Sequence, residues 1–156
     1  FNHPGPFYVR LGRPKVFSIE NKGPFVLGLA QKLRDGKDVT IIACGIMVNE
    51  ALLAADELQK KNYSVRVLNM HSIRPLDKEA IIKAAKETGR IVVCEEHTLS
   101  GGLASSVAEV VGENAPAKLA YLGIKSRFGQ SGEPAELLKE YNLTSQDIEK
   151  AALSMF

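Results

Sequence analysis

The stretch that decides the fold runs from Asp38 to Met70 and reads "DVTIIACGIMVNEALLAADELQKKNYSVRVLNM". Its first part is a short, β-branched apolar run that stops at Gly45, which is typical of a buried strand. The part from Met47 to Asn62 carries apolar residues at helical spacing, and the part from Tyr63 onward is predicted as the next strand. A strand, a helix and a second strand in this order predict parallel strands joined by a right-handed crossover.

The same alternation continues along the rest of the chain. Asp77 is expected to cap the next helix at its N-terminus, and Gly89 is expected to end it. Further strands are expected in residues 90–96 and 117–124, and further helices in residues 101–113, 133–142 and 144–156. Strands alternating with helices predict a three-layer α/β/α fold around a mostly parallel sheet of about five strands. Residues 24–36 supply one possible antiparallel strand.

Residues 1–37 interrupt this pattern with prolines and glycines. They hold four of the seven prolines, and the chain starts with Phe and not with Met. We expect residues 1–15 to be the tail of a preceding domain, residues 16–37 to be a connector, and residues 38–156 to form the α/β domain. The chain is therefore expected to be a fragment of a longer protein.

Composition excludes several classes of function. Apolar residues make up 45% of the chain and charged residues 24%, which is an ordinary balance for a soluble domain. The net charge of +2 is spread along the chain, and the clustering of cations that is typical of a nucleic-acid-binding surface is absent. No run of about 18 apolar residues, the length that a membrane span needs, is present either. Cys44 and Cys94 stand in apolar runs, which favours buried, reduced thiols in a cytoplasmic protein over a disulfide or a metal pair.

The stretch "VCEEHTLSGGLASSV", from Val93 to Val107, is the first candidate site. It passes from a predicted strand through two acids and a histidine to a double glycine that opens a predicted helix. Ligands of parallel α/β sheets bind at such strand ends, and free N–H groups at a helix start can hold an anion. The alternative is that the glycines allow tight packing of helix against strand, since neither GxGxxG nor GxxxxGK[ST] is present.

Two more stretches carry cations beside turns. His71 and Arg74 follow a predicted strand, where Arg74 could bind a carboxylate or phosphate, or could order the loop by pairing with a local acid. Arg10, Arg13 and Lys15 lie close together on a glycine-proline turn, and the planar fork of arginine suits phosphate. The sequence offers no complete catalytic set, because no nucleophile stands in an elbow motif and no histidine spacing matches a zinc site.

The following stretches occur in order and span nearly the whole chain: "RLGRP", "DVTIIACGIMVNEALLAADEL", "VRVLNMHSIRPLDKEAI", "RIVVCEEHTLSGGLASSVAEVV" and "SGEPAELLKEYNL". The ordered set resembles the C-terminal region of transketolase and its thiamine-diphosphate relatives. No single stretch is decisive for this family, but the ordered set of stretches is specific to it. The resemblance implies three domains, carried by one chain or split over two subunits.

The resemblance also implies where the chemistry resides. The first domain of the family binds the diphosphate of thiamine diphosphate together with a divalent metal (Mg), and the second, pyrimidine-binding domain supplies the glutamate that activates the cofactor. The third is an α/β domain that assists dimerisation. This chain looks like the third domain, with residues 1–15 as the tail end of the second. Since neither the diphosphate motif nor the activating glutamate is found here, the chain alone is expected to be inactive and to bind no cofactor.

By this resemblance the chain is the C-terminal part of a transketolase, which transfers a two-carbon ketol unit between sugar phosphates in the pentose phosphate pathway. Deoxyxylulose-phosphate synthase is an alternative, although it typically has a "RYPRG"-like stretch where this chain has "VRLGRPK". A 2-oxoacid dehydrogenase β subunit is another, although these usually lack the combination of "EEH" and "GEPAELL". A non-catalytic regulatory or interaction module is the alternative from a different class.

Residue roles follow from the same resemblance. In transketolases an arginine in an "SRP"-like turn contacts the substrate phosphate; Arg13 matches it, with Gly12 in place of the usual serine. The junction around residues 94–102 falls in a domain that is mostly architectural. Possible contacts with another domain or with a homodimer partner are therefore expected at Glu95, Glu96, His97, Gly101 and Gly102. The expected partners are the other transketolase domains or subunit, a second copy, and sugar phosphates in the full enzyme.

Overall fold

The structure, a computed structural model, describes residues 3–12, 18–19 and 23–156. Its strands are β1 (Gln31–Arg34), β2 (Val39–Ala43), β3 (Val65–Asn69), β4 (Arg90–Thr98) and β5 (Lys118–Ile124). Its helices are α1 (Met47–Lys60), α2 (Lys78–Thr88), α3 (Leu103–Asn114), α4 (Pro134–Glu140) and α5 (Ser145–Leu153). The order of elements is the alternation that the sequence predicts.

One five-stranded sheet has the strand order β1-β3-β2-β4-β5. β2 pairs in parallel with β3 and β4, and β5 pairs in parallel with β4. β1 joins β3 in the antiparallel direction and is the strand predicted within residues 24–36. The predicted fold class, a mostly parallel sheet with one antiparallel strand, is therefore confirmed.

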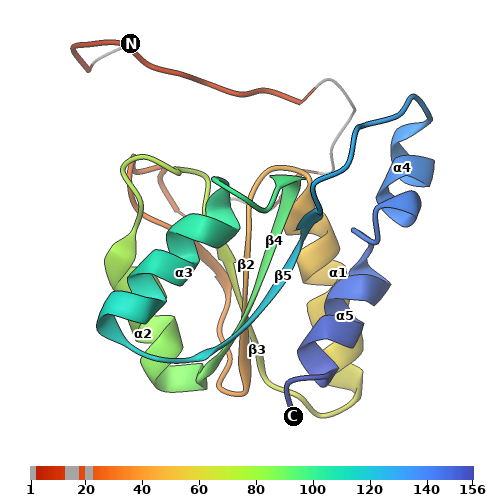
Figure 1. Ribbon diagram of the computed structural model, residues 1–156. Helices are drawn as coiled ribbons and strands as arrows, with labels where there is room; N and C mark the ends of the chain where they lie inside the picture. The colour runs from red at the N-terminus through yellow and green to blue at the C-terminus, as the bar shows by residue number, and fades with distance from the viewer. Residues whose placement is uncertain (1–2, 13–17, 20–22) are drawn as a thin grey trace.

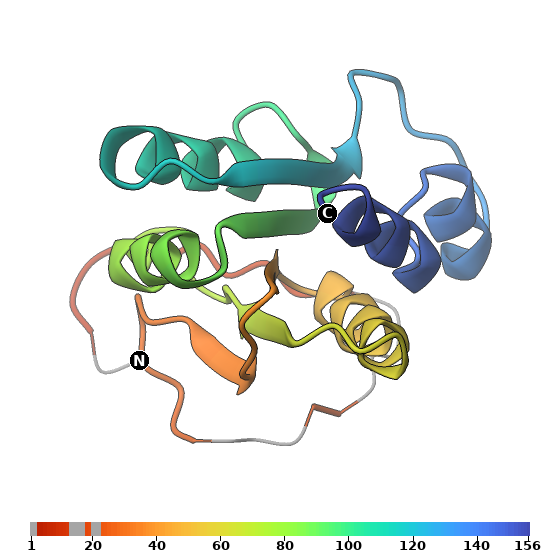
Figure 2. The same ribbon diagram turned by 90° about the horizontal axis from the view of Figure 1, so that it is seen from below.

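Helices cover both faces of the sheet. α1 and α5 lie on one face, and α2 and α3 lie on the other (Figures 1 and 2). On the first face, Met47, Ala51 and Leu58 of α1 pack in one apolar core with Ile148 of α5. The second face has a separate core, which includes Ile42, Ile81, Leu103 and Val107. Burial of β2 on both sides explains its unbroken apolar run.

Local signals fix the helix ends. The Asp77 side chain accepts a hydrogen bond of 3.0 Å from the N–H of Ala80, and Gly89 ends α2 in the left-handed conformation with φ 64°. Thr144 and Asp147 form the capping box that their spacing predicts. Within the described ranges, no helix is long and apolar enough to cross a membrane.

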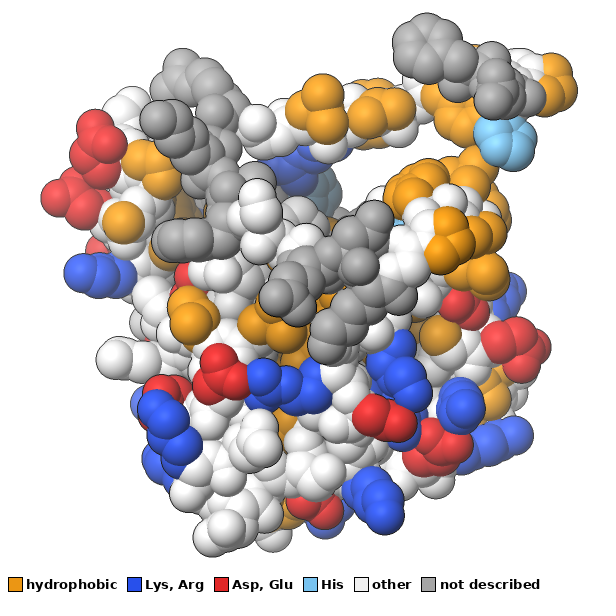
Figure 3. All heavy atoms as spheres, turned by 180° about the vertical axis from the view of Figure 1, so that it is seen from behind, with side chains coloured by type: hydrophobic (Ala, Val, Ile, Leu, Met, Phe, Trp, Pro, Cys, Tyr) orange, Lys and Arg blue, Asp and Glu red, His pale blue; other side chains and the backbone are white. Residues whose placement is uncertain are grey.

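Residues 3–12 form an arm that crosses above the end of the sheet where β2 and β4 finish (Figure 1). Its large apolar side chains are exposed: Tyr8 by 90% and Leu11 by 85%. Phe25, which is 70% exposed, adds to the exposed apolar surface near this end. Seen from behind, hydrophobic side chains gather below the arm, whereas acidic and basic side chains mix over the lower part of that face (Figure 3).

Candidate functional site

The candidate ligand-binding site lies at the carboxyl ends of the parallel strands, because the loops of parallel α/β sheets converge there. Three described segments meet at this end: the turn after β2, the loop from β3 to α2, and the loop from β4 to α3. The arm passes over them (Figure 1). The candidate residues therefore share one end of the molecule, and their side chains decide what that end can bind.

Glu95 occupies the start of α3. One carboxylate oxygen accepts a hydrogen bond of 2.8 Å from the N–H of Leu103, and the other accepts one of 2.8 Å from Ala104. Glu95 is 2% exposed, so this is a buried negative charge held by the free N–H groups and the positive end of the helix dipole. The N–H groups that an external anion would need are already used by a residue of the chain.

The double glycine makes this arrangement possible. A Cβ on Gly102 would lie 2.2 Å from Glu95 Oε2, so a side chain at this position would displace the carboxylate. Gly101 has φ 79°, a conformation that favours glycine, and its N–H donates to Ser105 Oγ at 2.9 Å. Of the two interpretations of this stretch, close packing between helix and strand agrees with the geometry.

Glu96 and His97 differ from Glu95 in that they are exposed. The Arg10 guanidinium of the arm donates to the Glu96 carbonyl oxygen at 3.5 Å, and it lies 4.0 Å from the Glu96 carboxylate. His97 Nδ1 lies 3.0 Å from the carbonyl oxygen of Thr98. Glu96 thus connects the arm to the domain loosely, and both residues leave polar groups accessible to a neighbour.

The loop from β3 to α2 is tied to the segment that precedes β1. Ser72 Oγ accepts from the N–H of Gly28 at 3.1 Å, and Asp77 Oδ2 accepts from the N–H of Ala30 at 2.7 Å. The His71 ring stacks on Phe25 with 4.4 Å between centroids, and burial lowers the pKa of His71. The loop is therefore structural in this part.

Arg74 is exposed in the same loop, after which the bond to Pro75 is cis. Among the residues that the structure describes, it has no ion-pair partner, so pairing with a local acid is not observed. His71 Nδ1 lies 3.0 Å from Ser72 Oγ. This contact is no catalytic dyad, because the other partner of the histidine is an aromatic ring that cannot orient it as a base.

The two cysteines are free. Cys94 is buried as expected, whereas Cys44, just past the end of β2, is only partly buried. Burial, followed by the nearby charge of Glu95, raises the pKa of the Cys44 thiol to about 11. Burial raises the pKa of the Cys94 thiol well above its usual range. Both are protonated at neutral pH, and a thiol in that state is a poor nucleophile and metal ligand.

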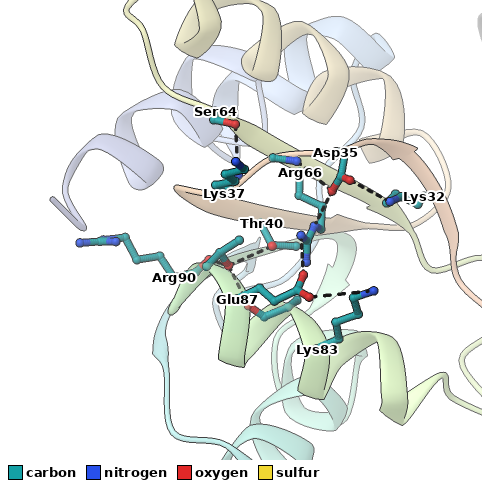
Figure 4. A network of polar contacts seen from close by, with 12 residues as sticks. Lys32, Asp35, Lys37, Thr40, Ser64, Arg66, Lys83, Glu87 and Arg90 are labelled. Atoms are coloured by element: carbon teal, nitrogen blue, oxygen red, sulfur yellow. Dashed lines mark hydrogen bonds and ion pairs between the residues drawn. The ribbon is translucent and has the colours of Figure 1, made fainter.

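A second polar cluster, missed at the level of sequence, lies at the opposite end of the sheet (Figure 4). Arg66 on β3 is 9% exposed in its side chain and bridges Asp35 Oδ1 at 3.2 Å and Glu87 Oε2 at 2.7 Å. Hydrogen bonds from Lys32 and from the N–H of Gly36 lower the pKa of Asp35 from 3.8 to about 2. The available signal was an arginine inside an otherwise apolar strand, which requires a paired charge.

Arg13 and Lys15, the remaining candidates for phosphate binding, lie outside the described residues. Among the residues that are described, no group of three or more His, Cys, Asp or Glu side chains could hold a metal ion. The arrangement at the carboxyl end can therefore pack, and can bind a neighbour through exposed charges. In the described part of the chain it does not assemble a nucleophile, a base and an orienting group.

Comparisons with known proteins identify relatives of the chain. The family model described as "Transketolase, C-terminal domain" matches residues 28–148. A 6-deoxy-6-sulfo-D-fructose transketolase subunit from Clostridium sp. (strain MSTE9) is 44% identical over 96% of this chain and 47% of its own length. A 1-deoxy-D-xylulose-5-phosphate synthase from Heliobacterium modesticaldum (strain ATCC 51547 / Ice1) is 38% identical over 95% of this chain and 24% of its own length.

A solved structure titled "Split gene transketolase, inactive beta4 tetramer" superposes with a TM-score of 0.82 and 41% identity. It covers 91% of this chain and 46% of the other chain. The chain thus spans less than half the length of these relatives, 47% of the Clostridium subunit and 46% of the solved protein.

Proposed function

The chain belongs to the transketolase family as a C-terminal domain, and from this we propose that it is the C-terminal part of a transketolase. The complete enzyme transfers a two-carbon ketol unit between sugar phosphates. The observation that carries the proposal is the family match over residues 28–148, together with the similarity to a transketolase subunit and to a split-gene transketolase. Within this enzyme the chain serves assembly and contributes one arginine to the substrate.

The domain boundaries proposed are residues 1–15 for the tail end of the pyrimidine-binding domain, 16–37 for the connector and 38–156 for the C-terminal domain. The exposed arm supports the first of these, because Tyr8 and Leu11 are apolar side chains that a further domain would cover. β1 falls within the connector and pairs with β3, so that the connector also closes one edge of the sheet.

Thiamine diphosphate and a divalent metal are assigned to the part of the enzyme outside this chain. Mg²⁺ takes oxygen ligands, and the described residues offer no cluster of acidic side chains for it. A diphosphate favours free N–H groups at a helix start, and those of α3 are used by Glu95. The described residues do not fit either group, and so we derive no catalytic step from them.

Arg13 is proposed to bind the phosphate of the sugar substrate. Arg10, three positions earlier, contacts the Glu96 carbonyl oxygen at the carboxyl end of the sheet. The contact of Arg10 lies at the end where α/β sheets bind ligands, which supports the proposal. A guanidinium fork suits a phosphate dianion because it can donate two parallel hydrogen bonds.

The partners proposed are the other transketolase domains or subunit and a second copy of the protein, in the cytoplasm. Among the residues expected to make these contacts, Glu96 and His97 offer exposed polar groups beside Arg10. Gly101 is exposed next to them. Glu95 and Gly102 contribute indirectly, because their mutual contact sets the course of the loop that presents the others.

A reconstituted assay tests the function. The full-length protein containing this chain is combined with the family's cofactor-binding part, thiamine diphosphate, Mg²⁺, a ketose phosphate donor and an aldose phosphate acceptor. We expect mass spectrometry to detect an acceptor lengthened by two carbons. The relative from Heliobacterium supports one alternative, which formation of 1-deoxy-D-xylulose 5-phosphate would favour. Absence of both products from a complete, cofactor-loaded assembly would favour a non-catalytic module.

A further inference from the structure

The two borders of the sheet are built differently. β1, at one border, has four residues and a register irregularity between Lys32 and Arg34, whose charged side chains stand on the border strand. Short length, irregular pairing and charge are the devices by which proteins keep a sheet edge from pairing with another chain. This border is protected.

β5, at the other border, is longer, and its pairing with β4 becomes irregular only toward its end, between Cys94 and Thr98 of β4. It has seven residues, reads "KLAYLGI", and pairs with β4 residue for residue from Lys118 to Leu122. Its single charge is at its first position, and it contains no proline. Figures 1 and 2 show β5 along the border of the sheet, with α3 and α5 on its two faces, and within the described residues no strand lies beyond it.

The pairing with β4 determines which backbone groups of β5 point outward. The N–H of Lys118 donates to the carbonyl oxygen of Gly89, so Lys118, Ala120 and Leu122 use their backbone groups toward β4. By the alternation of a parallel ladder, Leu119 and Tyr121 direct theirs outward. In the described part of the chain nothing pairs with these groups. Tyr121 is 37% exposed and Leu119 is partly exposed, so the border is accessible here.

We propose that β5 pairs edge to edge and antiparallel with β5 of a second copy, which joins the two sheets into one across a twofold axis. The occupant follows from the strand itself, because its sequence is self-complementary. With the axis at Ala120, Leu119 of each copy faces Tyr121 of the other and exchanges both backbone hydrogen bonds, about four in total. Lys118 then faces Leu122, so no like charges meet.

Side-chain size agrees with this register. Ala120 faces its own copy in a pair without backbone hydrogen bonds, where Cα atoms approach most closely, to about 4.5 Å. Alanine tolerates this approach. On the α3 side of the sheet, the ring of Tyr121 covers the Leu119 side chain of the other copy, a cross-strand pair of the stabilising aromatic–aliphatic kind. The interface does not depend on the proposed enzyme activity.

Disulfide trapping in the full-length protein tests the register. In a Cys44→Ser background, Ala120→Cys is expected to form an intermolecular disulfide under mild oxidation, because about 4.5 Å between Cα atoms lies within disulfide range. Lys118→Cys is the matched control on the same strand. Its two copies would be about 13 Å apart along the paired strands, so it should not cross-link.

Tyr121→Pro, added to Ala120→Cys, removes an outward N–H but none that β4 uses. We expect at least a tenfold lower yield of cross-linked dimer with an unchanged circular dichroism spectrum, whereas Tyr121→Phe keeps the yield. No cross-link by Ala120→Cys alone, or equal cross-linking by Lys118→Cys, would overturn the proposal. Either result is independent of the two-carbon transfer assay, so failure of the interface is distinguishable from failure of the proposed function.

Discussion

Replacing Glu95 by alanine is expected to lower the free energy of unfolding by about 3–4 kcal/mol. The Glu95 carboxylate is 2% exposed and accepts hydrogen bonds of 2.8 Å from the N–H groups of Leu103 and Ala104. In the variant both buried N–H groups lose their acceptor, at about 1–3 kcal/mol each. Loss of a negative charge from the helix start costs about 0.3–1 kcal/mol more, and water entering the vacated space recovers part of the total.

Urea unfolding followed by circular dichroism measures this effect. With a slope of about 1–3 kcal/mol per molar urea, the expected loss moves the midpoint down by at least about 1 M. Glu95→Gln keeps the shape and one acceptor oxygen, so it should lose about half as much. These two variants separate the hydrogen bonds from the volume of the side chain.

Glu96→Ala is the matched control, because it removes the neighbouring carboxylate from the same loop. Its side chain is 50% exposed and lies 4.0 Å from Arg10, and a surface pair of this kind contributes about 0–1 kcal/mol. The midpoint should therefore change little. A loss below about 1 kcal/mol in Glu95→Ala, or equal losses in the two alanine variants, would refute the role of Glu95 at the helix start.

Four further outcomes are expected. Gly102→Ala should destabilise the fold by about 2 kcal/mol in urea, because its Cβ would lie 2.2 Å from Glu95 Oε2; an unchanged midpoint would contradict this. Arg13→Ala in the complete enzyme should raise KM for a sugar phosphate about ten- to a hundredfold and spare cofactor binding, through the loss of charge-assisted hydrogen bonds. Equal losses with a non-phosphorylated donor would show that Arg13 serves the fold instead. Cys44, with a pKa of about 11, should react slowly with a thiol reagent at pH 8 and faster as the pH rises; rapid, pH-independent labelling would count against this. Since its folded pKa of about 2 lies below the ordinary 3.8, Asp35 stabilises the fold above pH 3.8 and this contribution is lost as the pH falls toward 2. Asp35→Asn should therefore be less sensitive to this pH range than the parent protein, and parallel pH profiles would disprove it.

Regular features of this fold were predictable from sequence because each depends on local residues. The apolar run of β2, the cap at Asp77 and the stop at Gly89 act within a few residues of their own position. The role of Glu95 was not predictable in this way. A carboxylate at a strand end can face a ligand, a neighbour or its own chain, and only the path of the loop to Leu103 decides among these.

The degree of burial of residues at strand ends was also not predictable from the sequence. Cys44 and Cys94 stand in similar apolar runs, yet Cys44 follows the last residue of β2 whereas Cys94 lies inside β4. A thiol one position past the end of its strand is thus partly buried, whereas a thiol inside its strand is fully buried. The ion pairs of Arg66 could not be predicted either. Its sequence neighbours predict a buried strand, but its acidic partners come from distant segments of the chain.

The position of Glu95 has a consequence for how chemistry is divided in the proposed enzyme. The start of α3 has the N–H groups and dipole that bind phosphates in other α/β proteins, but here they hold a carboxylate of the same chain. A potential ligand site is thereby converted into a contact that stabilises the fold. In the proposed enzyme, phosphate recognition is assigned to Arg13, within the stretch proposed as the tail end of the preceding domain. Glu95 variants of the complete enzyme should accordingly lose stability with KM for the sugar phosphate unchanged, the reverse of the pattern expected for Arg13→Ala.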